Sequence, residues 1–104
     1  MITMDQSELI KILSAKKSNY EKKYGFTEML LFGSYASNSA TDKSDVDIAV
    51  KVDKGFKTYR NFIDAKTELS HDLGDRGIDL VYLDAINLNP IIKDAIEQES
   101  LKIE

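Results

Sequence analysis

The stretch from residue 45 to residue 52 alternates between polar and apolar side chains, and it narrows the possible folds more than any other part of the sequence. Its apolar members are Val46, Ile48, Val50 and Val52, and its charged members are Asp45, Asp47 and Lys51. A period of two puts successive side chains on opposite faces of a strand. The stretch therefore predicts a strand with one buried face, and it predicts that both aspartates project from the other face.

The remaining elements are predicted from the helical spacing of apolar residues, from capping signals and from short apolar runs. In chain order they are a helix over about 5–22, a strand over 26–32, the strand over 45–52, a helix over about 59–73, a strand over 78–83, a helix that begins at Asn89-Pro90, and a short strand over 101–103. This order predicts an α/β (α+β) fold. We expect a small mixed sheet with helices packed on one face and the other face free for chemistry.

Length and composition limit the domain organisation and the classes of function. A chain of 104 residues predicts a single domain over 1–104. There is no cysteine, which excludes thiolate metal sites and fits a reducing cytoplasm. No apolar run approaches the about 20 residues of a membrane span. The net charge of −4 argues against unaided binding to nucleic acid, which requires a basic surface. We therefore expect a cytoplasmic protein with neither a membrane nor a direct nucleic-acid partner.

A third aspartate is predicted to lie beside the first two. If the apolar residues of the strand over 78–83 face the core, Asp79 projects from the same face as Asp45 and Asp47. Carboxylate oxygens are the ligands that Mg²⁺ and Mn²⁺ prefer. Three convergent carboxylates can hold two such ions, the arrangement that stabilises the entering and leaving oxygens in phosphoryl transfer. The sequence thus predicts a site for two Mg²⁺ ions, with Mn²⁺ as an alternative.

Gly33 and Ser34 follow the first predicted strand and open the loop that leads to Asp45. A glycine lets the backbone approach a phosphate closely, and the following N–H groups and the serine hydroxyl can donate to it. The resulting pattern, G-S-x10-D-x-D with a later strand aspartate, resembles the DNA polymerase beta-like nucleotidyltransferase superfamily. The length and the order of elements resemble its minimal nucleotidyltransferase branch, and the likeness extends over almost the whole chain.

The resemblance implies a role for each matching residue. Gly33 and Ser34 would bind the β- and γ-phosphates of a nucleotide. Asp45 and Asp47 would ligate both metal ions. Asp79 would ligate the catalytic ion and help to remove the proton from the attacking hydroxyl. Attack at the α-phosphorus would then release pyrophosphate.

The resemblance also implies a partner. Members of the minimal branch commonly act beside a small helical HEPN-type protein, as the antitoxin of a toxin–antitoxin pair. The implied activity is AMPylation of a tyrosine on that toxin, with ATP or another NTP as the donor. Two alternatives remain open. One is transfer to a small molecule such as an aminoglycoside, which would normally need a further substrate domain. The other is a module without turnover that neutralises its partner sterically.

The loop after Ser34 departs from the pattern. Relatives often have Ala-Arg-Gly where this chain has 36–38, Ala-Ser-Asn, so the arginine is absent and its contact to phosphate or partner is in question. Lys43 or Arg60 could supply a charge instead. Asn38 can adopt the left-handed conformation that a glycine would supply. Tyr35 could either stack on a nucleotide base or pack over the loop.

Overall fold

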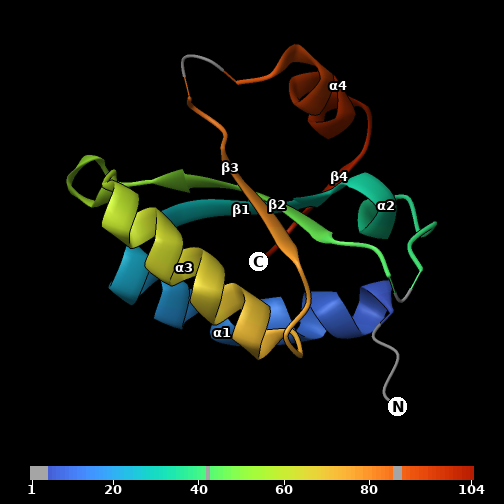
Figure 1. The fold of residues 1–104 in the computed structure, drawn as a ribbon, viewed down its shortest axis with the longest axis horizontal. Coiled ribbons are helices and arrows are strands. Elements are labelled where there is room, and N and C mark those ends of the chain that lie inside the picture. Colours follow the sequence, from blue (N-terminus) through green and yellow to red (C-terminus); the bar gives the residue numbers. More distant parts are fainter. Residues whose placement is uncertain (1–4, 42, 86–87) are drawn as a thin grey trace.

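A four-stranded mixed sheet lies at the centre of the computed structural model, which describes residues 5–41, 43–85 and 88–104 (Figure 1). The strands are β1 (Phe26–Phe32), β2 (Val46–Val52), β3 (Ile78–Tyr82) and β4 (Ser100–Lys102). Their spatial order is β3-β2-β1-β4. β1 pairs antiparallel with both β2 and β4, whereas β2 and β3 run parallel. The predicted fold class, a small mixed sheet with helices, is confirmed.

Two long helices cover one face of this sheet. These two helices are α1 (Gln6–Tyr24) and α3 (Tyr59–Asp72). The shorter helical segments are α2 (Gly33–Ala36), the 3-10 turn η1 (Lys54–Phe56) and α4 (Pro90–Gln98). In Figure 1, α1 and α3 lie together on one side of the sheet, and α4 lies on the other side. The expectation that the helices all pack on one face is therefore wrong for α4. No residue of α4 is fully buried. Within the described parts of the chain, no helix is both long enough and apolar enough to cross a bilayer.

The ends of the helices are fixed by local capping contacts. The Asp5 carboxylate accepts a hydrogen bond from the N–H of Glu8 at 2.9 Å, and α1 ends at Gly25, whose φ of 71° is left-handed. Thr58 and Asn89 cap α3 and α4 in the same way, through Oγ1 and Oδ1. Such caps satisfy backbone groups that have no partner inside the helix. The sequence prediction of all three helices therefore holds to within about two residues.

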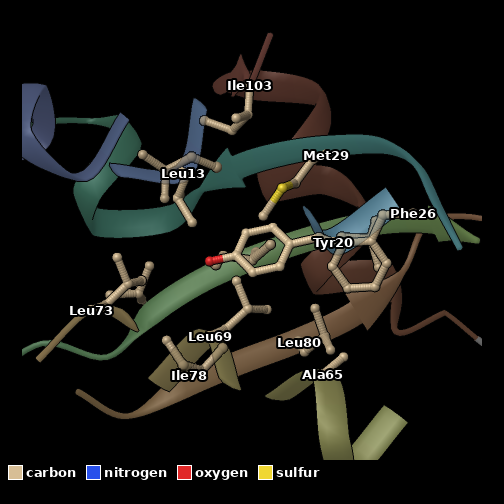
Figure 2. Close-up of a cluster of buried hydrophobic side chains, with 14 of the residues drawn as sticks. Leu13, Tyr20, Phe26, Met29, Ala65, Leu69, Leu73, Ile78, Leu80 and Ile103 are labelled. Carbon is tan, nitrogen blue, oxygen red and sulfur yellow. The ribbon is translucent and has the colours of Figure 1, made fainter. Parts of the chain in front are cut away.

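The core lies between the sheet and the two long helices (Figure 2). Val46, Ile48 and Val50 of β2 are fully buried in it, as the alternating pattern predicts. Figure 2 shows side chains from α1, α3, β1 and β3 meeting there, together with Ile103. Burial of each aliphatic side chain of this size stabilises the fold by about 1.5–3 kcal/mol. The opposite face of β2, which carries Asp47, is consequently left to the site.

Tyrosine hydroxyls join α1 to α3 at the edge of the core. The Tyr20 hydroxyl donates to Asp72 at 2.8 Å, and the Tyr24 hydroxyl donates to Glu68 at 2.9 Å. Burial, together with the neighbouring carboxylates, raises the pKa of both phenols, to about 12 for Tyr24. These contacts fix the two helices relative to each other on the side of the sheet away from Asp47.

Candidate active site

Asp47 and Asp79 lie directly opposite each other on the parallel strands β2 and β3. Their strand neighbours Ile48 and Ile78 are buried in the core, so both aspartates project from the other face. Asp47 is half-buried and Asp79 is exposed. Burial raises the pKa of Asp47 to about 6, with further contributions from a hydrogen bond to Asp79 and from the negative charges of Asp79 and Asp45. The elevated pKa therefore reflects first the burial of the Asp47 carboxylate and second the two carboxylates beside it.

Asp45 stands one residue before β2, which begins at Val46 rather than at the predicted position 45. The N–H of Val46 donates to the carbonyl of Gly77 at 2.8 Å, which joins the starts of β2 and β3. The Asp45 carboxylate lies against Gly77 so closely that a Cβ there would overlap with it. The absence of a side chain at Gly77 thus makes room for Asp45 beside β3.

Gly33 brings the loop backbone against Asp47. It follows β1 directly, begins α2 and has a φ of 70°. A Cβ at this position would overlap with the Asp47 carboxylate, and a left-handed φ disfavours any side chain there. A group bound by the backbone at Gly33 and Ser34 would therefore be adjacent to Asp47. The structure brings Gly33, Asp47 and Asp79 together, with Ser34 next to Gly33 in α2 and with Asp45 just before β2, against Gly77.

The donor set suits a hard divalent cation, although the carboxylates do not form a closed metal cage. Across residues 5–41, 43–85 and 88–104, no group of three His, Cys, Asp or Glu side chains is arranged as a ready metal site. Asp47 and Asp79 form a pair, and Asp45 lies to their side against Gly77. All the candidate ligand atoms are carboxylate oxygens. The Asp47 carboxylate is partly buried beside two other carboxylates, and a cation would offset this unfavourable placement of negative charge. The residues present therefore fit Mg²⁺ or Mn²⁺.

The loop after Ser34 is anchored by an arginine that the sequence reasoning missed. Tyr35 is only 3% exposed, so it packs in the loop rather than lying open to a base. Its hydroxyl accepts a hydrogen bond from Nη1 of Arg76 at 2.7 Å. Asn38 has the expected left-handed conformation, with a φ of 59°. The one sequence signal for Arg76 is its place three residues before Asp79.

Lys43 and Arg60 are the two residues that the sequence suggested as a source of positive charge near this loop. Arg60 belongs to the first turn of α3, beyond the far end of β2, and its side chain is 88% exposed. It pairs with Asp64 on the same helix at 3.2 Å. Lys43 is exposed in the loop that precedes β2. Among the residues that the structure describes, Arg76 contacts the loop after Ser34 through the Tyr35 hydroxyl.

Residues 8–103 match the model of the family Polymerase beta, Nucleotidyltransferase, and the chain belongs to this family. A Methanocaldococcus jannaschii protein named "Putative protein adenylyltransferase MJ0128" is 38% identical over 99 residues, which cover 93% of this chain and 96% of the relative. "Protein adenylyltransferase MntA" from Thermococcus cleftensis is 36% identical over 81 residues, which cover 78% of each chain. The chain is thus a nucleotidyltransferase-family protein whose relatives are named protein adenylyltransferases.

Solved structures share the fold. One described as "Structure of putative minimal nucleotidyltransferase" superposes with a TM-score of 0.78 at 26% identity, covering 97% of this chain and 98% of the other. Another, described as "Crystal structure of the toxin-antitoxin with AMP-PNP", has a TM-score of 0.64 at 21% identity, covering 88% of this chain and 72% of the other. The second likeness extends to the fold alone.

Proposed function

We propose that this protein transfers AMP from ATP to a tyrosine hydroxyl of a helical HEPN-type toxin, and that it acts in the cytoplasm as the antitoxin. The observation that carries the proposal is that Asp47 lies opposite Asp79 and also lies close to the backbone of Gly33. Relatives named protein adenylyltransferases support the choice of AMP and of a protein acceptor. The fold shared with a toxin–antitoxin structure supports the choice of partner.

In this proposal, residues of this chain bind the nucleotide and accept the proton of the attacking hydroxyl. Gly33 and Ser34 bind the β- and γ-phosphates, which places the α-phosphorus beside the aspartates. The tyrosine oxygen attacks the α-phosphorus, and the bond between this phosphorus and the pyrophosphate oxygen breaks. Asp79 accepts the phenolic proton, and its exposure leaves room for an acceptor that arrives from outside. Pyrophosphate leaves from the Gly33 side. Most of the rate enhancement then comes from position and charge stabilisation.

The same aspartates would hold the divalent cations that the phosphates require. We assign Asp45, Asp47 and Asp79 as ligands of two Mg²⁺ ions, with Mn²⁺ as a substitute. When bound, the ions neutralise the charge that builds up on the phosphate oxygens. Without cations, the three carboxylates would repel the negatively charged phosphates of ATP.

Intact-mass spectrometry of the partner tests the proposal. Mixed with its HEPN-type partner, ATP and Mg²⁺, the wild-type protein should add mass to the partner in steps of one AMP and release pyrophosphate. Asp79→Asn should abolish the added mass. Asp53→Asn is the matched control, because it removes an exposed carboxylate just beyond the far end of β2 and should transfer normally.

The inhibition of the toxin separates the proposal from a steric mechanism. If the partner stays unmodified but is still inhibited, and Asp79→Asn inhibits it equally well, the protein neutralises its partner by binding alone. The proposed transfer would then be wrong.

A further inference from the structure

The phenol of Tyr35 connects α2 to a distant loop through a buried polar contact. Tyr35 is the third residue of α2, two positions after Gly33. Its hydroxyl accepts the 2.7 Å hydrogen bond from Arg76, and the guanidinium carbon of Arg76 lies 5.9 Å from the centre of the Tyr35 ring. The two residues are 41 positions apart in the chain. A hydrogen bond to a charged group is stronger than one between neutral groups, so this contact joins the two loops firmly.

A second contact fixes the other end of α2. The side-chain amide of Gln6, in the first turn of α1, donates to the carbonyls of Tyr35 at 2.8 Å and of Ala36 at 3.0 Å. A helix of four residues is too short to be stable by itself in water. The conformation of α2, and hence of the Gly33–Ser34 turn at its start, therefore depends on contacts from elsewhere in the fold.

The backbone at Arg76 is itself held in place. Its carbonyl accepts a 2.6 Å hydrogen bond from the Ser70 hydroxyl of α3. The next residue, Gly77, accepts from Val46 at the start of β2 and lies against Asp45. Because β3 begins at Ile78, only Gly77 separates Arg76 from the strand that carries Asp79. The guanidinium of Arg76 thus links the segment before Asp79 to Tyr35, which follows the Gly33–Ser34 turn.

We propose that Arg76 and Tyr35 are positioning residues, which hold the Gly33–Ser34 turn at a fixed place relative to Asp47 and Asp79 for binding of the ATP phosphates. The inference rests on the proposed function, because it assumes that this turn binds phosphate. The role of Arg76 is to orient the turn rather than to touch the reacting atoms.

Two substitutions test this without removing the packing. Tyr35→Phe deletes only the phenolic oxygen and leaves the buried ring. Arg76→Met removes the cation and keeps an unbranched stem. Each should raise the KM for ATP about tenfold in a pyrophosphate-release assay, because both variants lose the charge-assisted hydrogen bond between Arg76 and Tyr35. Tyr35→Phe also loses the longer 3.5 Å donation from the phenol to the Thr41 carbonyl. The kcat at saturating ATP should change much less, and each variant should remain folded at the assay temperature.

The double variant provides the decisive readout. If the two residues act through one contact, Tyr35→Phe combined with Arg76→Met should raise the KM no further than either change alone. Arg76→Lys, which keeps a cationic donor, should recover part of the affinity. Arg60→Met is the matched control, since it removes an exposed arginine far from the loop and should leave the KM unchanged.

Each result then has one meaning. Unchanged KM values in both single variants, additive increases in the double variant, or a KM that rises only as the melting temperature falls would overturn the inference. If the wild-type protein neither binds ATP with Mg²⁺ in titration calorimetry nor releases pyrophosphate, the proposed function itself fails, and the inference fails with it. A wild type that transfers AMP beside variants with an unaltered KM overturns the positioning role alone.

Discussion

Asp47→Asn should make the protein more stable at neutral pH while it abolishes transfer. The pKa of Asp47 is raised from 3.8 to about 6, so the folded state binds this proton more tightly than the unfolded state does. Below the unfolded value both states are protonated and the residue has no effect on stability. The penalty grows as the pH rises from about 4 and is complete above about 6. Asparagine cannot ionise, and it therefore removes the penalty.

The size of the gain follows from the pKa shift. A rise of about two units corresponds to about 3 kcal/mol at 1.36 kcal/mol per unit. Asp47 is only half-buried, so solvent screens the repulsion, and we expect about 1 kcal/mol. For a domain of this size that is a rise of about 4–8 °C in melting temperature. The difference should be present at pH 7.5 and should disappear near pH 4.

Differential scanning calorimetry in EDTA measures this directly, with Asp53→Asn as a control whose small effect should not follow the same pH profile. Transfer by Asp47→Asn should fall at least about a hundredfold under conditions in which the wild type is active. A melting temperature at pH 7.5 below that of the wild type, or a difference that is the same at pH 4, would refute the reasoning from an unfavourably placed, partly buried charge.

Three further predictions concern the metal, the core and the acceptor. Titration calorimetry should show ATP binding much more tightly with Mg²⁺ than with EDTA, and equal affinities would count against a metal-dependent site. Val46→Asp should unfold the protein, because Val46 is fully buried and an unpaired charge there has no partner; a native circular dichroism spectrum would contradict this. Without a partner, any slow self-modification should fall on Tyr59, which is 80% exposed, whereas the other four tyrosines have buried or hydrogen-bonded hydroxyls. Peptide mapping that finds AMP on another tyrosine, or undiminished labelling of Tyr59→Phe, would contradict that assignment.

The sequence by itself determined the local features of this protein. Alternation through 45–52 predicted which face of β2 is buried and that Asp47 projects from the other. Capping residues such as Asp5 and Asn89 predicted where helices begin. These signals work because strand periodicity and helix capping depend on side chains only a few residues apart. The candidate site could be predicted from the sequence for the same reason, since Gly33, Ser34 and Asp45 belong to the one segment that connects β1 to β2.

Only the tertiary structure decided the contacts between distant segments. The parallel register that sets Asp47 opposite Asp79 depends on how α3, which connects β2 to β3, packs against the sheet. In β1 a register shift between Phe26 and Glu28 buries both Phe26 and Met29, which simple alternation would place on opposite faces. The hydrogen bond from Arg76 to Tyr35 joins residues that no local pattern connects. Such pairings depend on burial and loop closure over the whole chain. The periodicity of a few consecutive residues therefore cannot predict them.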